Sequence, residues 1–525
     1  MAKHRIGAVR TLQTLSLLAT TVAYTTAHVF QSELRSSASV ASTGGRVSEL
    51  TENASNRAME ALRTMQPPAK GGSPVTDLDR SQMHGVHVCA MLTACLGSCV
   101  AGTTLGFASV AMSSIEREPW YNLAGSEPGN HWLADSLLLG AAGGALFSGF
   151  PLWSVGSRKT ILACAVGLSV SWIVLAASFN LFVLFLARVS CGLWLGIITI
   201  GVSLYVAEVA PVKKRAFYTG LTEAATCFGI ATTYMLEGVS WRVQAALWAT
   251  ASLSLLGVER FLVESPLWLR ARGRHHESDA AAARLYGMVR PPELRRGSKA
   301  DVGDAAKAPV PNRALARRLC TCLALHLLQG ATLMQLFLCR GMQTMASVVD
   351  EVAAPLAALL MTGMQAVFVV VFASLTRITG RRHLLFVSTA LIAICFGGFQ
   401  PFDHLIFRQW SLQGVQFQTS WKAVYSVNLM VLSYSVGLCH LPSLLTAELF
   451  PGAARLHYVG APVVWAVRWL LAFIVLHYGQ ELVTFARKGH MAIVAAAALV
   501  VLCGVLVAII PETEDRTLAE IETRL

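Results

Sequence analysis

Apolar segments of about 20 residues recur from Val86 to the end of the chain, and this recurrence limits the fold more than any other feature. A helix of that length spans the roughly 30 Å hydrocarbon core of a bilayer. The sequence therefore predicts an all-α integral membrane protein with about twelve transmembrane helices, at residues 86–111, 133–153, 160–178, 181–207, 217–236, 243–262, 318–340, 352–375, 384–400, 423–446, 459–478 and 491–510.

The composition excludes a chain of soluble domains, because 54% of the 525 residues are hydrophobic and only 14% are charged. The net charge of +12 comes from short basic clusters between apolar segments, which is typical of membrane orientation signals and not of a nucleic-acid interface. The twelve cysteines lie mostly inside apolar segments, without metal-binding spacing. The sequence carries no nucleotide loop, metal cluster or nucleophile arrangement, so we expect no enzymatic activity, cofactor, metal or nucleic-acid partner.

Polar stretches divide the chain into parts. The first is a tail that cannot bury a core, although its basic start MAKHRIGAVR and the short apolar run after it resemble a weak signal peptide or anchor. A second stretch separates the sixth and seventh apolar segments. The predicted parts are the tail at 1–83, a six-helix bundle at 84–262, a central loop at 263–317, a second six-helix bundle at 318–510 and a short C-terminus at 511–525.

Lysine and arginine collect in alternate loops, which predicts the orientation of the chain. The basic loops contain Arg158-Lys159, Lys213–Arg215, Arg381-Arg382 and Arg455, and the central loop is basic too. Because loops rich in these residues stay in the cytoplasm, both termini are predicted to be cytoplasmic. The acceptor sequence at Asn53 is then not expected to carry a glycan, and the bilayer is either the plasma membrane or an endomembrane.

An internal repeat relates the two bundles. The sequence AEVAPVKKR follows the fourth apolar segment, at 207–215, and AELFPGAAR follows the tenth, at 447–455. The two sequences share a Glu-x-x-Pro-x-x-x-Arg pattern and begin 240 residues apart. Basic doublets follow the second and eighth segments, and acidic turns follow the sixth and twelfth. We infer that the two bundles arose by duplication.

Each half thus places basic and acidic residues at the predicted cytoplasmic ends of its helices. Opposite charges there can pair and hold helix ends together, and a network that closes only when the cavity faces outward would be a latch for alternating access. The alternative is a set of solvated interfacial charges. The positive-inside rule would explain the basic residues in that case, but it would leave the matched glutamates unexplained.

These loops also resemble those of the sugar-porter family of the major facilitator superfamily, over about residues 86 to 521. The segment LARVSCGLWLGIITIGVSLYVAEVAP resembles that family's arginine and spaced glycines before a Tyr-x-x-Glu turn. VESPLWL is similar to PESPRWL, TGRRHLL to the GRR loop, and PETEDRTLAEI to PETKGRTLEEI. The resemblance implies the major facilitator fold of two six-helix repeats, a lipid-embedded monomer, and cytoplasmic salt-bridge residues at Arg158, Arg188, Glu208, Arg215, Glu264, Arg381, Arg382, Glu448, Arg455 and Glu512. The family's aspartate before each basic doublet is replaced by Ser154 and Arg377.

A sugar site needs amides that donate and accept hydrogen bonds, and an aromatic face against the sugar's CH groups. In the seventh segment, Gln329 and Gln335 match the spacing of a glutamine and an asparagine of sugar porters, although the adjacent second glutamine is Gly330. In the eleventh, Trp469 is similar to a cavity tryptophan. The alternatives are interhelical hydrogen bonds for the glutamines and a core or interfacial place for the tryptophan.

Three further positions depart from the sugar-porter pattern. Ser443 stands where a tryptophan is expected, Glu223 where a glutamine is expected, and Arg468 where an amide is expected. A lone charge at that depth is costly, so we hypothesise that Glu223 and Arg468 face one cavity and pair. The alternative is that each lies near a helix end and reaches the interface. The substrate-binding candidates are Gln329, Gln335, Trp469, Glu223, Arg468 and Ser443.

The resemblance makes a facilitative carrier of a hexose or related polyol the leading functional prediction. Proton-coupled sugar porters commonly carry an aspartate in the first segment, where Thr104 stands here, and threonine does not titrate usefully. Glu223 keeps proton symport open, because a buried carboxylate can carry a proton. Arg468 keeps an organic-anion carrier open, and the altered cavity keeps a transporter-like nutrient sensor open.

Overall fold

A computed structural model describes residues 85–115, 118, 127–286, 312–346, 349, 353–398, 421–450, 457–479, 481, 491–511, 513–518 and 521. The described helices all belong to one unit of the chain, Met83–Leu525. The predicted tail with its signal-like segment and Asn53, together with residues 287–311 of the predicted central loop, lies outside the described residues.

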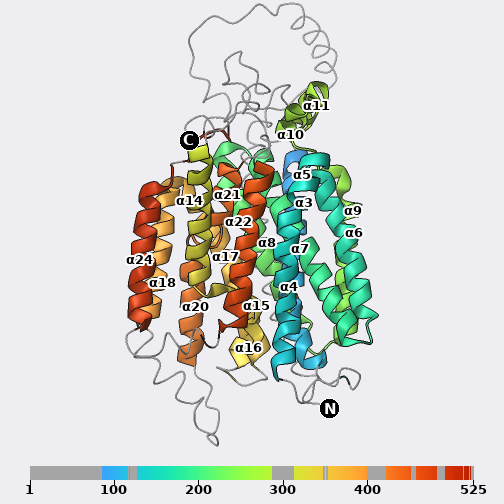
Figure 1. The fold of residues 1–525 in the computed structure, drawn as a ribbon, viewed down its shortest axis with the longest axis vertical. Helices are drawn as coiled ribbons and strands as arrows, with labels where there is room; N and C mark the ends of the chain where they lie inside the picture. The colour runs from blue at the N-terminus through green and yellow to red at the C-terminus, as the bar shows by residue number, and fades with distance from the viewer. Residues whose placement is uncertain are drawn as a thin grey trace, which may run out of the picture. The chain divides into compact units, whose positions relative to one another are not determined.

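The first half of the described bundle follows the predicted order of six segments (Figure 1). Asn180 begins one of its long helices, because its side-chain oxygen accepts a hydrogen bond from the Phe182 amide at 2.9 Å. The helices are α3 (Gly85–Ile115), α4 (Glu127–Phe147) with α5 (Gly149–Val155), α6 (Ser157–Ala176), α7 (Leu181–Val209), α8 (Arg215–Met235) and α9 (Trp241–Gly257). Two short helices follow, α10 (Pro266–Ala271) and α11 (His275–Tyr286).

The second half also follows the prediction, but two predicted helices are broken. Residues 318–340 form a helix that stops before Leu333, whose φ of 55° is left-handed, and residues 423–446 are interrupted by a turn over 436–440. The described helices are α14 (Asn312–Ala331), α15 (Met334–Cys339), α16 (Gly341–Ala346), α17 (Ala354–Thr379), α18 (Arg381–Gly398), α20 (Trp421–Ser435), α21 (Leu441–Leu449), α22 (His457–His477) and α24 (Met491–Ile509).

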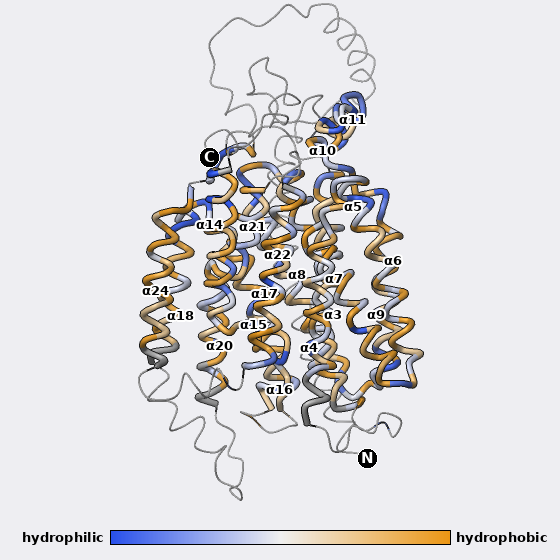
Figure 2. The backbone as a smooth tube through the Cα atoms, viewed as in Figure 1, coloured by the Kyte–Doolittle hydropathy of each residue, from blue (hydrophilic) through white to orange (hydrophobic). Residues whose placement is uncertain are grey.

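Length and composition mark several described helices as membrane spans. Five are long and apolar enough to cross a bilayer alone, within α3, α6, α7, α17 and α22, and α4 with α5 makes a sixth with a 42° bend. Large apolar side chains such as Phe150, Phe179 and Ile378 are exposed on the bundle, as they would be towards lipid. Figure 2 shows hydrophobic residues along the helices of both halves, whereas α11 is largely hydrophilic.

The two halves meet through reciprocal helix pairs. The second span of the first half, α4, packs against the fifth span of the second half, α22, and conversely α17 packs against α8. Within each half, the third and sixth spans also pair, as α6 with α9 and α18 with α24. This reciprocity is the arrangement that the predicted duplication requires, and it leaves a seam between the halves.

Glycines bring α4 and α7 into backbone contact. A Cβ added at Gly144 would lie 1.9 Å from the Leu193 carbonyl oxygen, and one added at Gly192 would lie 2.0 Å from the Leu137 carbonyl oxygen. Within lipid, helices associate through such close packing, because burial of apolar surface from water supplies no driving force there. The spaced glycines of the fourth predicted segment therefore fix the approach of α4 to α7.

We predict that Gly144→Ala destabilises the protein while Gly143→Ala does not. The new methyl group at Gly144 would push α4 from α7 and cost about 1–3 kcal/mol, as overpacking usually does. A Cβ at Gly143 meets nothing within 4 Å, and alanine is the better helix former by about 1 kcal/mol. Thermal unfolding of the purified variants in detergent measures both effects. Equal unfolding midpoints for the two variants would contradict the close packing.

Candidate functional site

A cavity lies on the seam between the two halves. Its volume, counted as the space open to the centres of water molecules, is about 60 Å³. One water needs about 10–15 Å³ by that measure, so the cavity has room for several. Its walls come from α3, α7 and α8 of the first half and from α15, α17, α20 and α22 of the second, with polar lining at Ser98, Thr199, Ser203, Thr222, Glu223, Thr226, Gln335, Gln365, Tyr434, Trp465, Arg468 and Trp469.

Two polar atoms of residues that line the cavity have no hydrogen-bond partner among the described residues. They are the indole nitrogen of Trp469 and the side-chain oxygen of Gln365, both buried. Gln335 is half-buried, and among the described residues its side chain makes one weak contact, from its nitrogen to the Cys339 sulfur at 3.5 Å. Buried polar groups are nearly always satisfied in folded proteins, so unsatisfied groups on a cavity wall are poised for a ligand or water.

Glu223 and Arg468 line the same cavity, but they do not form the predicted ion pair. The Ser443 hydroxyl donates to the Glu223 carboxylate at 3.0 Å. The Arg468 guanidinium lies over the Trp465 ring, 4.6 Å from its centroid, and 5.5 Å from that of Trp469. Each charge therefore has its own polar or aromatic partner, and both lie within their helices, away from the ends. The alternative prediction, in which each charge lies near a helix end and reaches the membrane interface, is therefore wrong.

Gln329 does not line the cavity. Its nitrogen donates to the Tyr434 hydroxyl at 2.8 Å and to the Leu438 carbonyl at 3.0 Å, and its oxygen pairs with His326 at 3.1 Å. Pro442 has no N–H to offer the Leu438 carbonyl four residues earlier, and Gln329 supplies the missing donor. The interhelical alternative for this glutamine is therefore what the structure shows.

The predicted charge network is built around Glu448 at the end of the bundle that carries Arg158, Lys213, Lys214 and Arg381, here called the basic end. One carboxylate oxygen of Glu448 pairs with Arg215 of the first half at 3.2 Å, and the other pairs with Arg381 of the second half. All three side chains are buried. The network therefore joins the two halves directly.

Two other predicted members of the network, Glu264 and Arg382, make separate contacts at the basic end. The Glu264 carboxylate accepts hydrogen bonds from the backbone amides of Arg158 and Ser265, each at 3.2 Å. Burial raises the pKa of Glu264, and these amide bonds oppose the rise. Arg382 donates to the Ile510 carbonyl, and Glu208 is buried at the end of α7. The predictions for Arg455 and Glu512 lie outside the described residues.

Arg188 does not lie in this network, which differs from the prediction. It precedes Glu208 by 20 residues on the same helix, which places it about 30 Å away along the axis. Its surroundings include Cys339, Arg340 and Leu476 from the second half. The sequence signature does not show at which end of a long helix each of its residues lies. For this reason Arg188 was predicted at the basic end, whereas it lies towards the opposite end of α7.

A second charge cluster joins the halves at the end opposite the basic end, and the sequence prediction missed it. Asp135 of α4 is fully buried, and one carboxylate oxygen pairs with Arg340 at 2.7 Å. The other lies 3.1 Å from the His477 ring nitrogen. Both partners belong to the second half, and the ring of Trp132 lies 4.6 Å from that of His477. An aspartate inside the second apolar segment was the signal that could have revealed this cluster.

Comparisons with known proteins agree with this architecture. A family model described as "Sugar (and other) transporter" matches residues 90–525. The chain is 26% identical over 456 residues to Sugar transporter ERD6-like 7 of Arabidopsis thaliana, covering 83% of this chain and 93% of that protein. It is 25% identical over 457 residues to solute carrier family 2, facilitated glucose transporter member 8, of Bos taurus, covering 82% and 93%.

A solved structure shares the fold. The major facilitator superfamily proton:xylose symporter XylE, bound to 6-bromo-6-deoxy-D-glucose, matches with a TM-score of 0.70 at 19% identity, covering 84% of this chain and all of that one. The family match spans both halves and the cavity between them. The chain therefore belongs to the sugar transporter family, and it is a multi-pass membrane protein with the major facilitator fold.

Proposed function

We propose that this protein is a facilitative carrier of a hexose or a related polyol, working by alternating access. The observation that carries the proposal is the seam cavity, where Trp469 and Gln365 leave a donor and an acceptor unsatisfied. A polyhydroxylated ligand satisfies both kinds of group, since each hydroxyl donates and accepts. The relatives named above are sugar carriers, and not enzymes.

In this proposal the cavity residues have distinct roles. Gln335 and Gln365 hydrogen-bond the hydroxyls, and the Trp469 ring packs against the sugar's CH groups while its nitrogen donates. Glu223, held by Ser443, accepts from a further hydroxyl. The walls come from both halves, so bound sugar contacts each half and can stay in place while the halves rock.

The two charge clusters fit the gates that alternating access needs. Glu448 joins the halves at the basic end, and Asp135 joins them at the opposite end. Each opening must break one cluster, and a change that weakens one cluster shifts the population towards the state open at that end. By the positive-inside rule we place the basic end and both termini in the cytoplasm. We propose a monomer as the working unit.

Proton symport is the second candidate, and the carboxylates of the half-buried Glu223 and the buried Asp135 favour it. A carboxylate deep in the membrane can carry a proton when its environment changes between states. The relatives include a facilitated glucose transporter, and the matched structure is a proton:xylose symporter. Arg468 does not pair with Glu223, so its guanidinium is also available to bind an anionic sugar derivative or another organic anion.

Uptake into liposomes separates these candidates. Purified protein would be reconstituted and given labelled hexoses, inositol or organic anions, with and without an inward proton gradient. We expect saturable hexose or inositol flux that equilibrates and does not accumulate. Accumulation driven by the gradient would replace uniport with symport, and preference for the anions would replace the sugar. The absence of any saturable flux would favour the sensor.

We predict that Gln365→Leu and Gln335→Leu each raise the KM for sugar about tenfold. Each change removes one hydrogen bond to the ligand, which contributes about 1–1.5 kcal/mol. The control is Asn428→Leu, which removes an amide from α20 that bonds the Val424 carbonyl at 2.8 Å and does not line the cavity. Initial-rate uptake gives KM for all three. An unchanged KM in both glutamine variants, or an equal change in the control, would contradict their roles.

We predict that Glu448→Gln opens the basic end and destabilises the closed protein. Two buried guanidinium groups lose their counter-charge, and breaking a buried pair costs about 3–5 kcal/mol. Hydrogen exchange of the α21 amides and thermal unfolding measure the two effects. The control is Glu277→Gln, which breaks the exposed pair with Arg274 and should change neither. Equal hydrogen exchange in α21 and equal unfolding midpoints in the two variants would contradict the proposed latch.

A further inference from the structure

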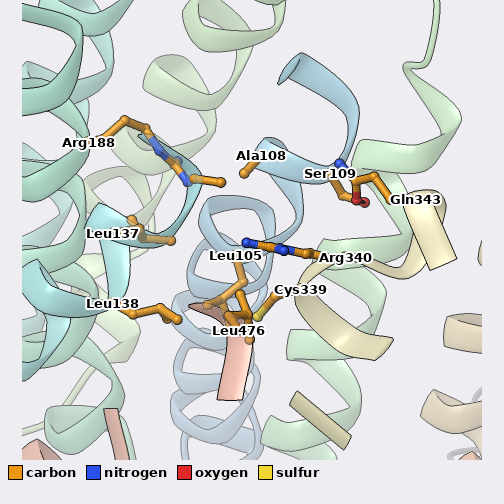
Figure 3. Close-up of a pocket in the computed structure, with 11 residues that line it drawn as sticks. Leu105, Ala108, Ser109, Leu137, Leu138, Arg188, Cys339, Arg340, Gln343 and Leu476 are labelled. Carbon is orange, nitrogen blue, oxygen red and sulfur yellow. Dashed lines mark hydrogen bonds between the residues drawn. The ribbon is translucent and has the colours of Figure 1, made fainter. Parts of the chain in front are cut away.

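A second, smaller cavity includes Arg340 of the Asp135 cluster in its wall, and Figure 3 shows the residues that line it. Its volume by the measure used above is about 20 Å³. That is room for one water or a small monatomic ion, but not for a sugar. Arg188 of α7 and Arg340, which follows α15, both line it, and Leu105, Leu137, Leu138 and Leu476 supply apolar walls.

Arg188 reaches this cavity without a hydrogen-bond acceptor. Its side chain is 3% exposed, and both terminal guanidinium nitrogens are buried with no partner among the described residues. The contact it has is with the face of Phe107, 5.6 Å from the ring centroid. Four N–H groups are thus left unsatisfied in a membrane interior, where unsatisfied donors are costly.

Among the described residues, nearby charges do not balance Arg188 either. Asp135 supplies one negative charge, but one of its oxygens is bonded to Arg340 and the other to His477. Arg188 and Arg340 together carry two positive charges, so the described side chains of the cluster hold at least one positive charge in excess. A water in the cavity would satisfy donors but leave that excess, and a buried uncompensated charge is strongly unfavourable.

We propose that this cavity binds a small monovalent anion of the halide class, such as chloride, between Arg188 and Arg340. One such ion accepts hydrogen bonds from the Arg188 guanidinium and cancels the excess charge. The apolar walls suit a weakly hydrated ion, and the size excludes sulfate, phosphate and carboxylates with a side chain. Gln343 lies at the rim and is exposed, so an ion can enter from the end opposite the basic end.

The site is separate from the sugar cavity and makes a separate prediction. An ion there links α7 of the first half to the α15–α16 junction of the second, so it stabilises the form that is closed at the Asp135 end. Halide would therefore protect the folded protein from unfolding even when no sugar is present. This effect does not depend on which sugar, if any, the central cavity carries.

The experiment is a halide titration of the purified full-length protein in detergent. The buffer contains gluconate, which is too large for the cavity, and chloride or bromide replaces it at constant ionic strength. We expect the thermal unfolding midpoint to rise and saturate with either halide. Arg188→Gln should abolish the rise or move the half-saturating concentration at least tenfold higher. Sulfate should give no saturable rise.

Two further variants make the test decisive. Arg188→Lys keeps a positive charge at the cavity and should retain a saturable rise with a half-saturating concentration below that of Arg188→Gln, a partial rescue that damage to the fold would not produce. Arg468→Gln alters the central cavity and should leave the halide titration unchanged. The proposal is overturned if wild-type protein shows no saturable response, if Arg188→Lys shows none, or if Arg468→Gln abolishes it while Arg188→Gln does not.

Discussion

Inside a bilayer no water is available to satisfy a polar group, and that constraint orders the whole structure. The Leu438 carbonyl shows it at the scale of one atom: Pro442 cannot donate to it, so Gln329 reaches from α14 to do so. The break between α20 and α21 is tolerated because this donor is present. The same glutamine also binds Tyr434, which lines the cavity. The residue that satisfies the backbone therefore also holds one wall of the site in place.

The constraint also explains why the charges gather on the seam between the halves. A charged side chain facing lipid would lack a partner, whereas the seam lets one half supply the acid and the other the base. At the basic end the two copies of the repeated motif supply the pair, with Glu448 as the glutamate of the second copy and Arg215 as the arginine of the first. At the other end Asp135 and Arg340 do not come from a repeated motif.

The positions of the helices could be predicted because hydropathy over 20 residues reports directly on membrane insertion. The predictions that were wrong concern helix breaks and the partners of individual side chains. The breaks at Leu333 and in the 436–440 turn depend on partners elsewhere in the chain, and a hydropathy pattern does not register them. Gln329 and Gln365 are both intramembrane amides, and only the three-dimensional contacts distinguish the one that satisfies a backbone from the one whose oxygen is left free. Arg188 was predicted at the wrong end of the bundle because the sequence pattern does not show which residues surround a side chain.

Two of the departures from the sugar-porter pattern, at Ser443 and Glu223, have one physical explanation. Ser443 stands in place of a tryptophan and Glu223 in place of a glutamine, and the serine hydroxyl donates to the glutamate at 3.0 Å. A tryptophan at 443 would place a large ring where that hydroxyl now lies. The small residue and the acid therefore belong to one altered feature of the wall, which offers a carboxylate where other sugar porters offer an amide. That change keeps hydrogen bonding to hydroxyls and disfavours anionic ligands near α8, unless they bind closer to Arg468 on the facing helix.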